Sequence, residues 1–243
     1  MVAAGSRVAD RLSALEKEIT QCRACPRLVE WRERMAREKR ASFRDETYWG
    51  RAVPGFGDPR AGMLVVGLAP AAHGANRTGR PFTGDRSGDW LYAALHRAGF
   101  ANQAESVSGT DGLELVGARV IAAVRCAPPA NKPTPAERDR CNPFMAREVA
   151  LLPALKVVVA LGAFAFRAVL DVWREMGATL PKPAPRFGHG AEFSLPAGPG
   201  GGPAAKLISS YHPSPRNTFT GTLTEEMFDA VWSRARALVG PAA

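Results

Sequence analysis

Four short apolar runs, each followed by a segment in which apolar residues recur at helical spacing, place the strongest constraint on the fold of this chain. The runs are residues 63–67, 118–124, 157–161 and 206–210. The segments with helical spacing are 7–20, 26–40, 88–98, 135–152, 163–176 and 222–238. Continuous apolar strands that alternate with helices are typical of a parallel sheet covered by helices on both faces. The sequence therefore predicts a three-layer α/β/α fold around a mainly parallel, roughly four-stranded sheet.

The remaining segments are predicted to connect these elements. Residues 41–60 and 68–87 contain glycine and proline and are expected to be loops. Residues 177–203 are irregular by the same criterion, with a short strand suggested at 191–195. No internal repeat and no linker-like stretch divides the chain. We therefore expect one domain over residues 1–243, with an N-terminal helix in 1–20 and a core from about 20 to 238.

Arginine dominates the charge of this chain. Only six of its 32 basic residues are lysine, acidic residues number 23, and the formal net charge is +9 over 243 residues. Guanidinium groups suit phosphate contacts and a basic surplus is typical of nucleic-acid-binding proteins, although a GC-rich coding sequence gives the same bias. No apolar run approaches the ~20 residues that span a bilayer, and residues 1–20 do not resemble a signal peptide. We expect a soluble, cytoplasmic protein with no membrane contact.

The four cysteines fall in two pairs, Cys22-x2-Cys25 and Cys126-x14-Cys141. Two thiolates within one turn, completed by two from a distant segment, form a four-sulfur metal site. Structural zinc sites usually pair two tight CxxC turns, so the loose second pair favours an iron–sulfur cluster over zinc. Disulfides, a redox CxxC and unrelated buried thiols are the alternatives. A cytoplasmic location argues against disulfides, and a position between two predicted helices argues against a redox motif.

Chemically distinctive residues follow the predicted strands. Ligands bind at the carboxyl ends of parallel strands, and residues 67–87, 125–135, 162–163 and 211–221 leave those ends. The first segment supplies a carboxylate, an imidazole, an amide, a phenyl ring and guanidinium groups: Asp85, His73, Asn76, Phe82, Arg77, Arg80 and Arg86. This combination suits stacking on a base, contacts to phosphates and activation of water.

The same segment also restricts the class of ligand that the site can bind. It lacks the lysine of a P-loop and the GxGxxG of a dinucleotide-binding fold, so we expect no nucleotide cofactor. The simplest alternative for Asp85 is a structural one, in which its carboxylate caps the helix predicted from about Gly88.

Two further candidates lie after other strands. His212 directly follows the last strand, in a loop that two prolines stiffen, and such an imidazole can donate a hydrogen bond to a leaving group. Asn131 is an amide in a proline-rich segment and can pair with the edge of a base. A histidine that only caps the strand and an asparagine that only forms a turn are the structural alternatives.

Taken together, these motifs resemble family five of the uracil-DNA glycosylases, the group with an iron–sulfur cluster. The resemblance is carried by Gly67-Leu68-Ala69-Pro70-Ala71, residues 73–85, residues 124–135, Tyr211-His212, Arg216-Asn217-Thr218 and the cysteine spacing, and it extends over about residues 20–238. It implies removal of uracil, and often of other deaminated bases such as hypoxanthine and xanthine, from duplex DNA by a monomeric enzyme.

The resemblance also implies roles for individual residues. It implies a [4Fe-4S] cluster on Cys22, Cys25, Cys126 and Cys141, and catalytic roles for Asp85, His212 and Asn131. The residues expected to contact the base or the DNA are Gly67, Ala69, His73, Asn76, Arg77, Arg80, Phe82, Arg216 and Asn217.

Two positions depart from the wider superfamily. Other members carry an acidic or amide side chain where this chain has Leu68 and Ala69, so the catalytic carboxylate is expected to be Asp85. Arg216 stands where an apolar residue usually wedges into DNA, which leaves the wedging residue open. The alternative function is a non-catalytic, metal-containing protein that binds nucleic acid.

Overall fold

The centre of the molecule is a mixed sheet in the order β1-β3-β2-β4-β6-β5, six-stranded over the described residues. The computed structural model describes residues 2–240, with side chains from residue 7 onward. The strands are β1 (Phe56–Gly57), β2 (Met63–Gly67), β3 (Ala118–Ala122), β4 (Val157–Leu161), β5 (Glu192–Leu195) and β6 (Ala205–Ser210). The four central strands pair in parallel, and β1 and β5 add antiparallel edges.

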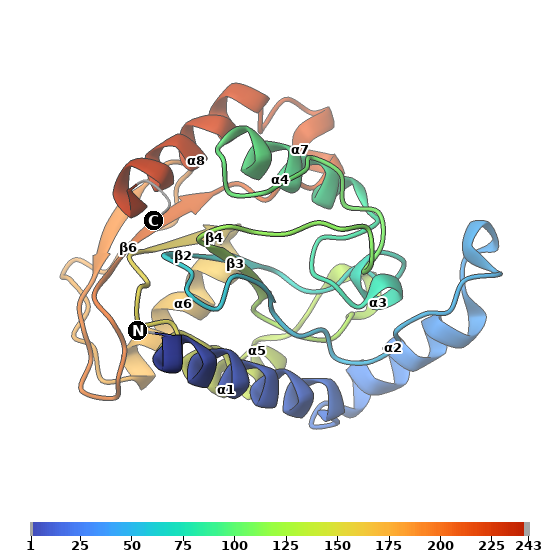
Figure 1. Ribbon diagram of the computed structural model, residues 1–243. Helices are drawn as coiled ribbons and strands as arrows, with labels where there is room; N and C mark the ends of the chain where they lie inside the picture. The colour runs from blue at the N-terminus through green and yellow to red at the C-terminus, as the bar shows by residue number, and fades with distance from the viewer. Residues whose placement is uncertain (1, 241–243) are drawn as a thin grey trace.

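Helices cover both faces of this sheet (Figure 1). The helices are α1 (Val2–Gln21), α2 (Pro26–Glu38), α3 (Ala75–Thr78), α4 (Arg86–Arg97), α5 (Pro135–Ala150), α6 (Ala163–Glu175), α7 (Pro215–Phe219) and α8 (Glu225–Val239). Short 3-10 helices lie at η1 (Ala41–Phe43) and η2 (Pro129–Asn131). Helices α4 and α8 lie on one face and α1, α5 and α6 on the other, so the predicted three-layer α/β/α class is confirmed.

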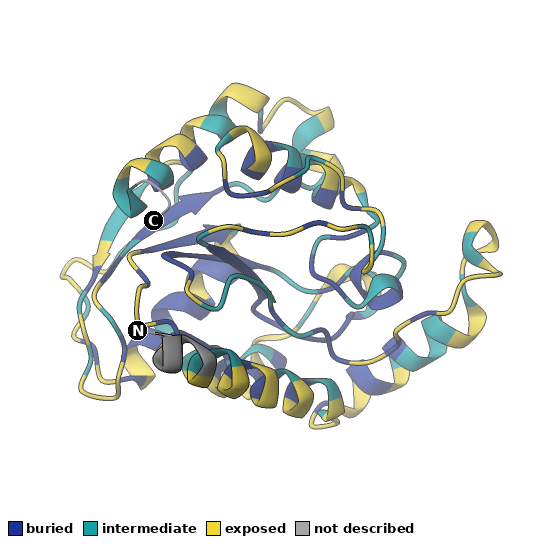
Figure 2. Cartoon of the chain, in the orientation of Figure 1, coloured by how far each residue is buried: buried dark blue, intermediate teal, exposed yellow. Residues whose placement is uncertain are grey.

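Alternate residues of each strand serve two separate cores, because successive side chains of a strand point to opposite faces. Leu64 and Val66 of β2 join the core under α5 and α6, whereas Met63 and Val65 join the core under α4 and α8. All five residues of β2, β3 and β4 are buried (Figure 2). The unbroken apolar runs in the sequence are the consequence of this two-sided burial.

Ion pairs fasten the N-terminal helices to the body. Glu16 of α1 contacts Arg119 of β3 at 2.5 Å, and Arg119 also pairs with the buried Glu148 of α5 at 2.7 Å. Arg27 of α2 forms a two-bonded pair with Glu137, the residue that completes the capping box of α5. The far end of α2 and η1 extend away from the body (Figure 1).

The sequence-based description needs three corrections. The sheet has two more strands than the roughly four expected: β1 lies inside a predicted loop, and β5 matches the short strand suggested near 191–195. Two short helices, α3 and α7, interrupt segments expected to be loops. The strand predicted to reach residue 124 ends at Ala122. No helix among the described residues is long and apolar enough to cross a membrane.

Candidate active site

A cavity of about 380 Å³ opens at the carboxyl ends of the central strands. Its walls come from the segment after β2, the end of β3, η2 and the loop after β6. Residues singled out from the sequence line it, among them Ala69, Phe82, Asp85, Arg86, Asn131 and His212. The volume lies within the range of about 300–1,000 Å³ that is typical of small-molecule sites. The prediction that strand ends would gather these side chains therefore agrees with their placement.

Two rings form one side of the cavity. The phenyl ring of Phe82 stacks on the imidazole of His212, with centroids 5.7 Å apart and planes inclined by 29°. The edge of the Phe82 ring lies against Gly67, where an added Cβ would come within 2.5 Å of two ring carbons. Gly67 therefore has a structural reason to be glycine, because any side chain would displace the ring.

The backbone of the cavity wall is strained at two non-glycine residues. Phe82 has φ = 52° and Asn131 has φ = 54°, both in the left-handed region. Such conformations are costly for residues with a Cβ and cluster at functional sites. The strain aims both side chains into the same cavity.

Asp85 has two distinct surroundings for its two carboxylate oxygens. Oδ1 accepts a hydrogen bond from the Gly88 N–H at 3.1 Å and so caps α4. Oδ2 faces Gly74, where an added Cβ would lie 2.1 Å from it. Burial raises the pKa of Asp85 above the usual value, although the Gly88 and Ser87 N–H groups favour the charged form. The capping alternative is thus correct for Oδ1.

His212 is held in the neutral form. It keeps some surface open to the cavity, yet burial by the surrounding protein lowers its pKa to about 4. Its carbonyl accepts a hydrogen bond from Asn217 Nδ2 at 2.8 Å, which fixes the start of the loop. No described residue hydrogen-bonds to its ring nitrogens. A neutral imidazole with a free N–H is suited to donate to a developing negative charge.

A groove beside the cavity shares Asp85, Arg86, Ala71 and Asn131 with it and is lined by basic side chains. Arg40, His73 and Arg77 line the part farther from the cavity. The Nδ1 of His73 lies 3.0 Å from the Tyr48 hydroxyl, and burial together with the two arginines lowers the pKa of His73. Asp85 therefore lies where the cavity meets a groove that is lined by Arg40, Arg77 and Arg86 and also by Asp89.

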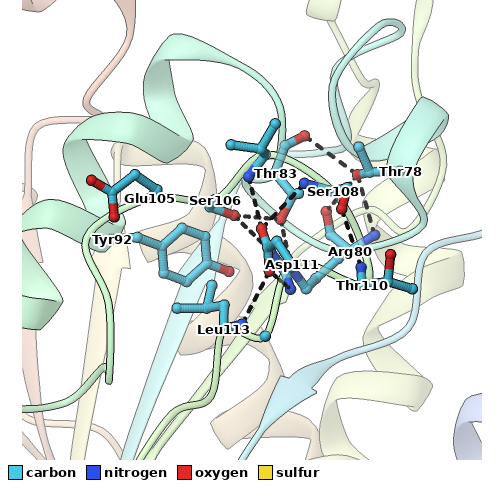
Figure 3. Close-up of polar contacts among 12 residues, drawn as sticks. Thr78, Arg80, Thr83, Tyr92, Glu105, Ser106, Ser108, Thr110, Asp111 and Leu113 are labelled. Atoms are coloured by element: carbon cyan, nitrogen blue, oxygen red, sulfur yellow. Dashed lines mark hydrogen bonds and ion pairs between the residues drawn. The ribbon is translucent and has the colours of Figure 1, made fainter.

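Arg80 does not reach the cavity. Its guanidinium forms two bonds to Asp111, of 2.8 and 2.7 Å, and further bonds to Thr83 and Ser106 (Figure 3). Burial alone would raise the pKa of Asp111, but Arg80 and the N–H groups of Leu113, Val107 and Ser108 hold it well below the usual value. Arg80 is only 5% exposed, so its guanidinium holds the loop around Phe82 and is not free to contact phosphate.

Asn76 and Arg77 are likewise buried and hydrogen-bonded within the fold. The Nδ2 of Asn76 donates to the carbonyl of Arg32 at 3.1 Å, which links α3 to α2. Arg77 pairs with Glu46 and donates from Nε to the carbonyl of His73 at 2.8 Å. Both residues position the segment that carries His73, although Arg77 still lines the groove.

Arg216 and Asn217 lie on α7, beside the cavity. Asn217 supports the His212 loop, whereas Arg216 is exposed. The sequence did not suggest two residues that support the site. Asp111 and Glu46 pair with the buried Arg80 and Arg77, and nothing in their local sequence predicts these ion pairs.

The four cysteines belong to one neighbourhood and form no disulfide. Burial raises the pKa of Cys126 to about 11 against the opposing effect of Arg32, and the neighbouring Cys22 and Cys25 raise it further. Burial likewise raises the pKa of Cys141, with smaller contributions from Cys126 and Cys25. Within the described part of the chain, no group of three or more His, Cys, Asp or Glu side chains is placed to hold a metal ion.

Buried cations beside these thiols suit a cluster of thiolates. Arg32 donates from Nη1 to Cys126 Sγ at 2.9 Å and from Nη2 to the carbonyl of Cys22 at 3.0 Å. The Nε of Arg32 and the Nε and Nη1 of Arg125 are buried without a partner among the described residues. Arg125 pairs through Nη2 with the buried Glu148, whereas Arg32 forms no salt bridge among the described residues. A buried cation needs a compensating anion, so Arg32 beside Cys126 fits a thiolate-ligated group.

Comparison with known proteins agrees with the fold and with the cavity. The family model of the uracil DNA glycosylase superfamily matches residues 54–236, from just before β1 to near the end of α8. The chain therefore belongs to the uracil-DNA glycosylase superfamily.

Within that superfamily the similarity is strongest to type-5 proteins among those compared. The chain is 51% identical to a type-5 uracil-DNA glycosylase of Mycobacterium tuberculosis over 233 residues, 96% of this chain and 83% of the other. It is 52% identical to a type-5 uracil-DNA glycosylase of Thermus thermophilus over 227 residues, 93% of this chain and 98% of the other. A type-4 uracil-DNA glycosylase of Pyrobaculum aerophilum is 29% identical over 126 residues, 51% of this chain and 56% of the other. The chain thus groups with the type-5 proteins.

Proposed function

We propose that this protein removes uracil from DNA by hydrolysing the N-glycosidic bond, which leaves an abasic site. The names of its relatives and its family support the reaction class. The observation that carries the proposal is the meeting of a phenyl ring, a neutral imidazole, a carboxylate and an amide at one cavity. An enzyme that acts on a base in duplex DNA must first extrude it, and a cavity of this size accepts a single base.

Recognition of the base falls to Phe82 and Asn131. Phe82 offers a ring for stacking, and the position of this ring is set by its contact with His212 and by the close approach of its edge to Gly67. The side chain of Asn131 lines the cavity and is exposed, so its amide oxygen and its NH2 group are both available to hydrogen-bond to the polar edge of a base.

Cleavage of the bond falls to Asp85 and His212. Rupture leaves positive charge on the sugar and negative charge on the base. The Asp85 carboxylate, between cavity and groove, stabilises the sugar and orients the attacking water. His212 remains neutral at physiological pH because its pKa is about 4, and its N–H stabilises the departing base.

The range of bases is a finer part of the proposal. We propose that hypoxanthine and xanthine are also released, because the cavity wall is mainly apolar and has few side chains that demand one pattern of polar groups. A panel of duplexes that carry one damaged base each tests this by base release. Release of uracil alone would restrict the enzyme to that base.

We further propose that Cys22, Cys25, Cys126 and Cys141 hold a [4Fe-4S] cluster. Such a cluster would cross-link the N-terminal segment, the segment after β3 and α5. Arg32, as hydrogen-bond donor to Cys126, would balance part of the charge of the thiolates, and the unpartnered Nε and Nη1 of Arg125 could donate hydrogen bonds to them. Iron and acid-labile sulfide assays on anaerobically purified protein test the proposal, and a colourless, zinc-containing preparation would contradict it.

The central experiment is alkali cleavage of a uracil-containing duplex after incubation with the purified protein. We expect strand cleavage at the uracil position, with the protein acting as a monomer and without a nucleotide cofactor. A protein that binds the duplex and leaves no alkali-labile site would instead be the non-catalytic, metal-containing nucleic-acid-binding protein of the alternative reading.

A further inference from the structure

Phe219 is the most exposed large apolar side chain in the described part of the chain. It is 69% exposed, and the other members of this set are Val107, Val116 and Trp49, at 63%, 46% and 37%. A single exposed apolar residue is ordinary in itself. The surroundings of Phe219 are what distinguish it.

Phe219 ends the short helix that begins at the cavity. Ser214 and Pro215, at the start of α7, line the cavity, and Phe219 closes the same helix. His212 lies at the base of this segment, two residues before the helix cap. The ring of Phe219 is therefore carried by the element that also carries the candidate catalytic imidazole.

This segment is stiff, so Phe219 has a fixed position relative to the cavity. Ser214 caps α7, and Asn217 Nδ2 donates to the carbonyl of His212 at 2.8 Å. The carbonyl of Asn217 in turn accepts from the N–H of Leu223 at 3.0 Å, and Leu223 is fully buried. An aromatic side chain on a rigid support loses little entropy when it stacks on a ligand.

One arginine contacts the ring, and a second lies on the same short helix. The guanidinium carbon of Arg86 lies 4.6 Å from the centre of the Phe219 ring, and Arg86 lines both the cavity and the adjacent groove. Arg216 precedes Phe219 by three residues, which places the two on one face of α7. Both arginines are exposed, and neither forms a salt bridge among the described residues, although Asp89 acts on Arg86 electrostatically.

We propose that Phe219 stacks on a base of the DNA next to the nucleotide held in the cavity, while Arg86 and Arg216 contact the flanking phosphates. The inference rests on the proposed function, since it needs a DNA strand at the cavity mouth. Aromatic rings that alternate with cations are the chemistry by which proteins hold unstacked nucleic acid. A protein partner would not require both cations to stand beside a cavity that accepts a base.

The experiment measures binding to a duplex with a tetrahydrofuran abasic analogue, over a series of salt concentrations. Phe219→Ala is expected to bind about tenfold more weakly with an unchanged salt slope, because stacking carries no charge. Phe219→Trp is expected to retain the affinity. Arg216→Ala is expected to reduce the log–log salt slope by about 0.9, the value for one phosphate.

Val116→Ala is the matched control, since Val116 is also exposed but lies just before β3, at the opposite end of the sheet. It should bind as the wild type does. Uracil release by the wild type is measured on a matched duplex. Wild-type release together with unchanged binding by Phe219→Ala would overturn this inference alone, whereas absence of release by the wild type would overturn the proposed function.

Discussion

The two segments that frame the cavity hold their polar side chains in opposite ways. In residues 67–88, Arg77 and Arg80 are buried and each is paired with a carboxylate of a distant segment. In residues 210–223, Arg216 is exposed and the loop is stiffened by prolines and by the Ser214 cap. Arginine thus has two roles: Arg77 and Arg80 hold the first segment together, whereas Arg86, near the end of that segment, and Arg216 in the second are exposed and form no salt bridge among the described residues.

This difference shows that arginine content alone does not locate a DNA surface. Arg77 and Arg80 are each matched by a carboxylate inside the fold, so they are not part of the basic surplus of +9 that is left for phosphate. The polar groups of the first segment hold Phe82 and Asp85 in position. Substitutions of those groups should therefore affect stability as well as activity. Substitutions in the second segment should affect activity with little change in stability.

The largest effect is expected at Asp85, which caps α4 and also lines the cavity as the proposed catalytic carboxylate. Asp85→Asn keeps an oxygen that can cap α4 through Gly88, because asparagine caps helices as well as aspartate does. It removes the negative charge, so the single-turnover rate of uracil release should fall by about 10²–10³-fold. Denaturant unfolding should show stability close to that of the wild type. A fully active Asp85→Asn protein would reduce Asp85 to a helix cap.

The pH dependence of the wild-type rate provides a second test of the catalytic role of Asp85. Burial raises the pKa of Asp85, and the carboxylate must be ionised to act. The rate should therefore decline on acidification already above pH ~4, where a solvent-exposed aspartate is still ionised. Asp85→Asn should lack this decline.

Much of this architecture was predictable from the sequence, and the reasons are local. Strands β2 and β4 coincide with the predicted runs, because burial on both faces demands uninterrupted apolar residues. The gathering of Phe82, Asp85, Asn131 and His212 followed from the rule that parallel strands end at one edge.

What could not be predicted depends on contacts between distant residues. Strand β1 is only two residues long and exists through its pairing with Arg119 and Val120. Arg80 faces inward because it pairs with Asp111, which lies 31 positions later in a segment without a recognisable pattern. Local sequence does not reveal whether an arginine has such a partner.

The next largest effect is expected for stability at Arg80. Arg80→Ala leaves the partly buried Asp111 carboxylate without its cation, and loss of these charge-assisted hydrogen bonds costs about 2 kcal/mol of unfolding free energy. Denaturant unfolding measures this. Arg97→Ala is the matched control, because the Arg97–Asp229 pair is exposed and should contribute less than about 1 kcal/mol. Equal losses in the two variants would contradict the structural role of Arg80.

The sign of the pH effect sharpens this test. The pKa of Asp111 is depressed in the folded state, so its contribution to stability is present above the unfolded value of about 4 and is lost as pH falls below it. The difference in stability between wild type and Arg80→Ala should therefore shrink on acidification. A difference that stays constant between pH 7 and pH 3 would rule out this ion pair as its source.

A somewhat smaller effect is expected at His212, in the second segment. His212→Leu removes the N–H that faces the cavity and should lower the rate of uracil release by about 100-fold, while His212→Asn, which retains a donor, should lose less. Stability should change little. Because the imidazole has a pKa of about 4, the wild-type rate should show no inflection near the usual histidine value of ~6.5. An inflection there that disappears in His212→Asn would show that His212 acts as a charged acid instead.

The smallest effect is expected at Arg86, which joins the two segments through its contact with Phe219. Arg86→Ala should lower the log–log salt slope of duplex binding by about 0.9, whereas Arg80→Ala should leave the slope unchanged. Arg60→Ala is the matched control, since Arg60 is highly exposed but precedes β2, at the end of the sheet away from the cavity. If Arg60→Ala and Arg86→Ala reduced the slope equally, the DNA would contact both ends of the sheet. The contrast between structural and ligand-facing arginines would then no longer follow the cavity.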